Sequence, residues 1–124
     1  MTTALVRQDR GQASVEFALA LPFVAMLLLG MVQVVVVVRD QLAVGLAARE
    51  GARAASVAAD PASAATRAAG AAVALTPLTV STSVADGRVT VHVTYTNDTS
   101  VALIGHVMGN VELDATVTMA REPP

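Results

Sequence analysis

The sequence predicts an α+β protein: a long N-terminal helix, a second Ala-rich helix, and then a small antiparallel β-sheet of about three strands. Three observations predict this class. An unbroken apolar run covers residues 17–38, Ala-rich segments flank Asp60-Pro61, and apolar and polar residues alternate from Leu78 onward. The first pattern is typical of a membrane helix, and the last has the period of a strand with one buried face.

The apolar run is long enough to cross a membrane. From Phe17 to Val38 no residue carries a formal charge, and only Gln33 is strongly polar. As a helix, about 22 residues rise roughly 33 Å, which exceeds a bilayer core of about 30 Å. Val34–Val38 would be a strand in a soluble protein, but in hydrocarbon only a helix satisfies its backbone without partners. We therefore expect a transmembrane helix over residues 12–38, with Pro22 tolerated near its start.

Beyond the apolar run, nothing breaks the helix, so we expect a helical extension over residues 39–58. Glu50 lies three residues before Arg53, a spacing that lets the two side chains meet on a helix. A stripe of small residues also follows one helix face: Gly45, Ala48, Ala52 and Ala55. Such a stripe lets another helix approach closely, or it simply reflects an Ala-rich composition.

Residues 59–124 are expected to form a small α+β domain. Asp60 can cap a helix and Pro61 suits its first turn, so a second helix is predicted over Ala62–Leu75, ended by Thr76-Pro77.

Three alternating segments then predict strands at Leu78–Val84, Val89–Tyr95 and Val111–Met119. Asp86-Gly87 predicts a tight hairpin turn, because both central residues of such a turn take positive φ. Val101–Met108 is expected to be a short helix or a buried loop. A sheet with one apolar face needs a cover, which we expect the helices to provide.

Composition narrows the function classes. The chain has no Cys and no Lys, and its net charge is −2, so it has neither thiol chemistry nor the basic stripe of a nucleic-acid-binding protein. His92 and His106, the only histidines, lack the clustered ligands of a metal site. Glu112 and Asp114 share one strand face, which we interpret as solvated, not catalytic. We predict no enzyme activity, no cofactor, no metal and no small-molecule substrate.

The most informative residues stand before the apolar run. A charged leader ends at Gly11, and Glu16 follows at the edge of the run, next to Phe17. A carboxylate at a membrane boundary is costly enough to need a reason. The alternative is that Glu16 lies in the headgroup layer, near a helix N-terminus that favours negative charge.

Together, the charged leader, the Gly, the Glu five residues later, the aromatic and the long apolar helix resemble the class III signal of type IV pilins. Within that superfamily, Gly11–Pro22 resembles the opening of the TadE-like family of pseudopilins, to which TadF is closely related. Ala48–Ala55 is similar to that family's second recurrent stretch. The resemblance covers about residues 10–56.

The resemblance implies that residues 1–11 are a leader, cut between Gly11 and Gln12 by a membrane-embedded prepilin peptidase. Glu16 would become the fifth residue of the mature chain, where the family's carboxylate is thought to neutralise the new terminal amine. An N-terminal Gln can also cyclise, which would remove that amine and leave Glu16 unpaired.

The resemblance further implies a minor pilin or pseudopilin of a Tad/Flp-type pilus system, which acts by helix packing and protein contacts. Its partners would be the peptidase, other pilin or pseudopilin subunits, the assembly machinery and the lipid bilayer. The helix contact motif would comprise Arg49, Glu50, Gly51 and Arg53. The chain would lie in a bacterial cell membrane as a single-pass protein, with its N-terminus cytoplasmic and its C-terminal domain extracytoplasmic.

Two alternatives belong to other classes. In a signal-anchored envelope protein with a small partner-binding domain, Gly11 and Glu16 would be coincidental. A secreted protein with a cleaved signal peptide is disfavoured, because the apolar run is too long and lacks a small-x-small site at its end. Basic residues flank the run on both sides, so their count does not decide its orientation.

Overall fold

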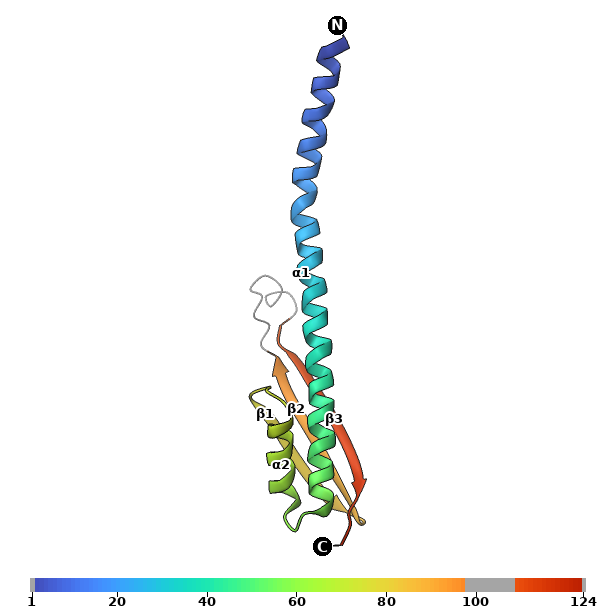
Figure 1. The fold of residues 1–124 in the computed structure, drawn as a ribbon, viewed down its shortest axis with the longest axis vertical. Coiled ribbons are helices and arrows are strands. Elements are labelled where there is room, and N and C mark those ends of the chain that lie inside the picture. The colour runs from blue at the N-terminus through green and yellow to red at the C-terminus, as the bar shows by residue number, and fades with distance from the viewer. Residues whose placement is uncertain (1, 98–108, 124) are drawn as a thin grey trace. The chain divides into compact units, whose positions relative to one another are not determined.

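A computed structural model describes residues 2–97 and 109–123, with side chains described over 11–96 and 109–123 (Figure 1). Its elements, in chain order, are α1 (Thr2–Val57), α2 (Pro61–Ala72), β1 (Leu78–Ala85), β2 (Arg88–Asn97) and β3 (Val111–Ala120). The predicted α+β class is confirmed, with a long helix, a second helix and a three-stranded antiparallel sheet. The expectation for Val101–Met108 lies outside the described residues.

The chain divides into two compact units, residues 1–35 and residues 36–124. The first unit consists of the N-terminal part of α1, which begins at Thr2, earlier than the predicted start near Gln12. Gly11 does not end this helix, since a glycine inside a helix costs only about 1 kcal/mol relative to alanine. Pro22 lies within α1 without ending it, and Val34–Val38 is helical as predicted.

In the second unit, the end of α1 and all of α2 cover one face of the sheet (Figure 1). Residues of α1 that recur every three or four positions are fully buried: Val44, Ala47, Ala48, Ala52 and Ala55. They meet Ala65 and Ala69 of α2 and the apolar residues of the sheet in one core. The small residues Ala48, Ala52 and Ala55 of the predicted stripe therefore face the chain's own domain and are not open to another helix.

The sheet has the order β1-β2-β3, and its register aligns the apolar residues on one face. Val93 of β2 lies opposite Val80 of β1 and Ala115 of β3. The predicted hairpin turn is confirmed, because Asp86 and Gly87 join β1 to β2 with φ of 52° and 69°. The core is built almost wholly from Val, Ala and Leu side chains.

A local cap and longer-range contacts fix the helix ends. The Asp60 carboxylate accepts a hydrogen bond from the Ser63 backbone N–H at 3.3 Å, which caps α2 as predicted. Its predicted end at Leu75 is wrong: α2 ends at Ala72, and Val73 is extended (φ −140°). Val73 and Leu75 instead pack against the core, a tertiary gain that outweighs continuation of the helix. Near the end of α1, the backbone N–H of Glu122, which follows β3, donates a hydrogen bond to the Ser56 carbonyl at 3.0 Å.

Candidate processing and assembly site

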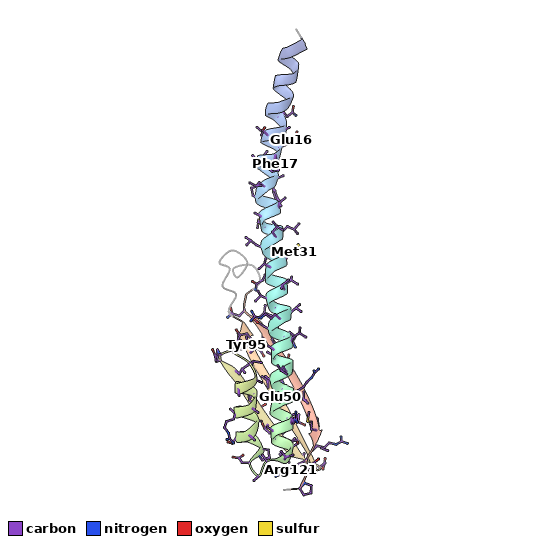
Figure 2. All side chains as sticks on the ribbon, in the orientation of Figure 1. Glu16, Phe17, Met31, Glu50, Tyr95 and Arg121 are labelled. Atoms are coloured by element: carbon purple, nitrogen blue, oxygen red, sulfur yellow. The ribbon has the colours of Figure 1, made fainter. Side chains whose placement is uncertain are left out.

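Gly11, Gln12, Glu16 and Phe17 lie on consecutive turns of α1, and all four are exposed. The structure brings two of them together, since the Gln12 side-chain amide donates to Glu16 Oε1 at 3.5 Å. Their separation of four residues places them on one helix face. Figure 2 shows Glu16 and Phe17 on the N-terminal half of α1, and Phe17 is 70% exposed.

Two glycines of α1 stand in opposite surroundings. A Cβ built on Gly11 would meet nothing within 4 Å. A Cβ on Gly51 would lie 3.3 Å from the Ala65 carbonyl oxygen and 3.3 Å from Val91 Cγ1. A side chain at Gly51, where α1, α2 and β2 meet, would therefore need its neighbours to shift by a few tenths of an ångström, whereas nothing within the described residues crowds Gly11.

The apolar part of α1 is uncovered. Among the described helices, α1 alone is long and apolar enough to cross a membrane, and its most apolar stretch is 0% buried. Phe23 is 75% exposed and Leu27 is 64% exposed. A continuous apolar surface of this extent marks an interaction site, and its length suits a lipid bilayer. The chain is thus consistent with a single-pass membrane protein.

The four residues of the predicted helix contact motif lie in three different environments. Gly51 is buried, Arg49 and Arg53 are exposed, and Glu50 is half-buried. Glu50 lines a shallow, open groove between α1 and α2 with Leu46, Ala68, Ala71 and Ala72. Within the described part of the chain, no ion pair joins Glu50 to Arg53.

The outer face of α1 also carries two leucines that sequence reasoning missed. Leu42 is 72% exposed and Leu46 is 46% exposed, both beyond the apolar run. Their spacing of four residues, continued from Val38, was the available signal. These leucines lie beside the exposed Arg49 and Arg53 and the half-buried Glu50 on this part of α1.

The polar face of the sheet forms a hydroxyl network around His92. Its Nδ1 lies 2.7 Å from Thr116 Oγ1, and its Nε2 lies 3.1 Å from Thr94 Oγ1. Both ring nitrogens are therefore engaged by hydroxyls. Glu112 and Asp114 are exposed on the same face, while His106 lies outside the described residues. Over residues 2–97 and 109–123, no cluster of three or more His, Cys, Asp or Glu side chains could hold a metal ion.

The fold and the uncovered helix define a class: a small α+β domain joined to one long apolar N-terminal helix. Within this class, residues 11–53 match the family model described as TadE-like protein. The match begins at Gly11 and ends at Arg53, so it confirms the resemblance over both recurrent stretches apart from the last residues of the second. Neither a curated protein nor a solved structure matches the chain.

Proposed function

We propose that this chain is a minor pilin-like or pseudopilin-like component of a Tad/Flp-type pilus assembly system. In this proposal a prepilin peptidase removes residues 1–11, and α1 anchors the mature chain in the cell membrane. The N-terminus faces the cytoplasm, and the domain outside the membrane contacts other subunits and the assembly machinery. The protein acts by helix packing and protein contacts, without catalysis.

The observation that carries the proposal is the match of residues 11–53 to the TadE-like family model. The freedom around Gly11 supports the processing step. Since α1 has open space where a Gly11 side chain would lie, a requirement for glycine there would come from outside the fold. A protease site that must admit the backbone closely is such a requirement.

The mature N-terminus gives the decisive test. Mass spectrometry of the protein purified from membranes of its own host should find a chain that begins at Gln12. A chain that begins at Met1 or Thr2 would instead support the alternative, a signal-anchored envelope protein.

A substitution pair tests the role of Gly11 directly. Gly11→Leu should block processing but leave membrane insertion intact, because leucine is apolar and favours helix. Ala20→Leu, at another exposed small residue of α1, should be processed normally. Normal processing of Gly11→Leu would refute the peptidase assignment.

Orientation is measurable because the chain has no Cys. A single cysteine at the exposed position Ser81 of β1 gives a unique label site on the domain. In intact cells with a permeabilised outer barrier, a membrane-impermeant thiol reagent should label Ser81→Cys. Labelling only after the inner membrane is lysed would place the domain in the cytoplasm and contradict the proposed topology.

A further inference from the structure

The proposed cleavage would make Gln12 the first residue of the mature chain, and the inference below rests on that cleavage. An N-terminal glutamine can close on itself. The α-nitrogen bonds to the side-chain Cδ, the Cδ–Nε2 bond breaks, and Nε2 leaves as ammonia with its own two hydrogens and one proton that the α-nitrogen loses. The product is a five-membered lactam with no positive charge, and the reaction needs neither oxidant nor cofactor.

We propose that Glu16 protects the new N-terminus by keeping Gln12 in its open, charged form. The geometric basis is the contact between these residues: the leaving nitrogen of the reaction, Gln12 Nε2, lies 3.5 Å from Glu16 Oε1. This hydrogen bond holds the amide toward Glu16, on the next turn of α1. Cyclisation would instead require the amide carbon to approach the α-nitrogen of Gln12, on the N-terminal side.

The negative charge of Glu16 opposes cyclisation of Gln12, as the hydrogen bond does. Only an unprotonated amine can attack Cδ, because a protonated amine has no lone pair. A carboxylate one helical turn away favours the protonated amine, and the effect grows as the surroundings become less polar. Between Gly11 and Val38, Glu16 is the only residue with a formal charge, so no other side chain in that span can provide this effect.

The consequence reaches beyond the terminal residue. An amine and a carboxylate that pair at the membrane edge cost less together than either charge does alone. Cyclisation would remove one member and leave the other charge in place. Glu16 therefore preserves its own partner by suppressing the reaction that would destroy it.

The test compares cyclisation rates in the mature full-length chain, held in detergent micelles and followed by mass spectrometry as the loss of one ammonia. Wild type should remain predominantly open. Glu16→Gln keeps the size and the hydrogen-bonding oxygen but removes the charge, and it should cyclise about tenfold faster.

Two control variants isolate the cause. Adding Gln12→Ala to Glu16→Gln should abolish the loss of ammonia from the N-terminal residue, because alanine has no side-chain amide. Glu50→Gln, a matched charge removal elsewhere on α1, should cyclise at the wild-type rate.

The inference is overturned if Glu16→Gln cyclises no faster than wild type, or if wild-type chains from cells already carry the lactam. Its failure is distinguishable from failure of the proposed cleavage, which is shown by an intact Met1 or Thr2 start. A site-specific protease sequence inserted directly before Gln12 releases the same N-terminus in vitro. The rates can then be compared whether or not the cell makes that cut.

Discussion

The side-chain amide of Gln41 on α1 donates a hydrogen bond to the backbone carbonyl of Asp114 on β3, with 2.9 Å between Nε2 and O. Because β3 is the last strand in the order β1-β2-β3, no strand of the described residues pairs with its outer edge. Carbonyls on such an edge would otherwise be left to solvent or to another chain. Gln41 thus satisfies one edge carbonyl and ties the helix to the sheet.

Loss of this contact should weaken the domain measurably. Gln41→Leu should lower the free energy of unfolding by about 1 kcal/mol, the usual net value of one hydrogen bond. Denaturant titration in detergent micelles, followed by circular dichroism, measures the change. Gln33→Leu removes a glutamine of α1 that makes no hydrogen bond within the described residues, and it should not lower stability. Equal losses for the two variants would contradict the role of Gln41.

Gly51 should tolerate a side chain far less well than Gly45. Gly51→Val forces a branched side chain against the Ala65 carbonyl and Val91 Cγ1, each 3.3 Å from the position of its Cβ. Overpacking of this kind costs about 1–3 kcal/mol of unfolding free energy. A Cβ on Gly45 meets nothing within 4 Å, so Gly45→Val should change stability by no more than about 0.5 kcal/mol. Thermal unfolding of both variants under one condition separates these outcomes.

Loss of the Asp60 cap of α2 should lower the free energy of unfolding by an amount comparable to that expected for Gly51→Val. Asp60→Ala removes the oxygen that accepts from the Ser63 N–H, and such changes cost about 0.5–2 kcal/mol. Asp60→Asn retains an accepting oxygen and should stay close to wild type. Chemical unfolding measures both variants, and a loss shared by Asn and Ala would point to the charge of Asp60 instead of its cap.

The hydrogen bond from the backbone of Glu122 to Ser56 can be removed by a substitution that deletes the backbone N–H. Glu122→Pro deletes the N–H that donates to the Ser56 carbonyl at 3.0 Å. We expect a loss of about 1 kcal/mol in unfolding free energy. Glu122→Ala, which keeps the N–H, is the control and should unfold like wild type.

The effect of an added charge on membrane anchoring should depend on where along α1 it is placed. Leu28 and Leu46 are both exposed, at 57% and 46%, but only Leu28 lies within the apolar run. An arginine within a membrane-spanning helix opposes insertion by about 2.5–3.5 kcal/mol near its centre. Leu28→Arg should therefore increase the fraction extracted from membranes by alkaline carbonate, whereas Leu46→Arg should remain membrane-bound. Retention of both variants would argue against the span proposed for α1.

Much of the fold could be predicted because its signals are local. The apolar run requires a helix in lipid, Asp86-Gly87 suits positive φ, and Asp60-Pro61 starts α2. Boundaries were less predictable: α2 ends before Leu75 because Val73 and Leu75 gain burial against the core, which no local pattern encodes. The candidate processing site was predictable as a spacing of residues, and the structure added the contact between Gln12 and Glu16.

The sequence by itself determined the class of the protein: one long apolar helix behind a charged leader, followed by a small domain with a three-stranded sheet. Those features depend on hydrophobic period, turn residues and length, which act between near neighbours in the chain. Only the tertiary structure decided that Ala48, Ala52 and Ala55 face inward, that a side chain would be crowded at Gly51 but not at Gly11, and that Gln41 reaches Asp114. Such relationships join residues far apart in sequence, 73 positions in the last case, and they exist only once helix and sheet have packed together.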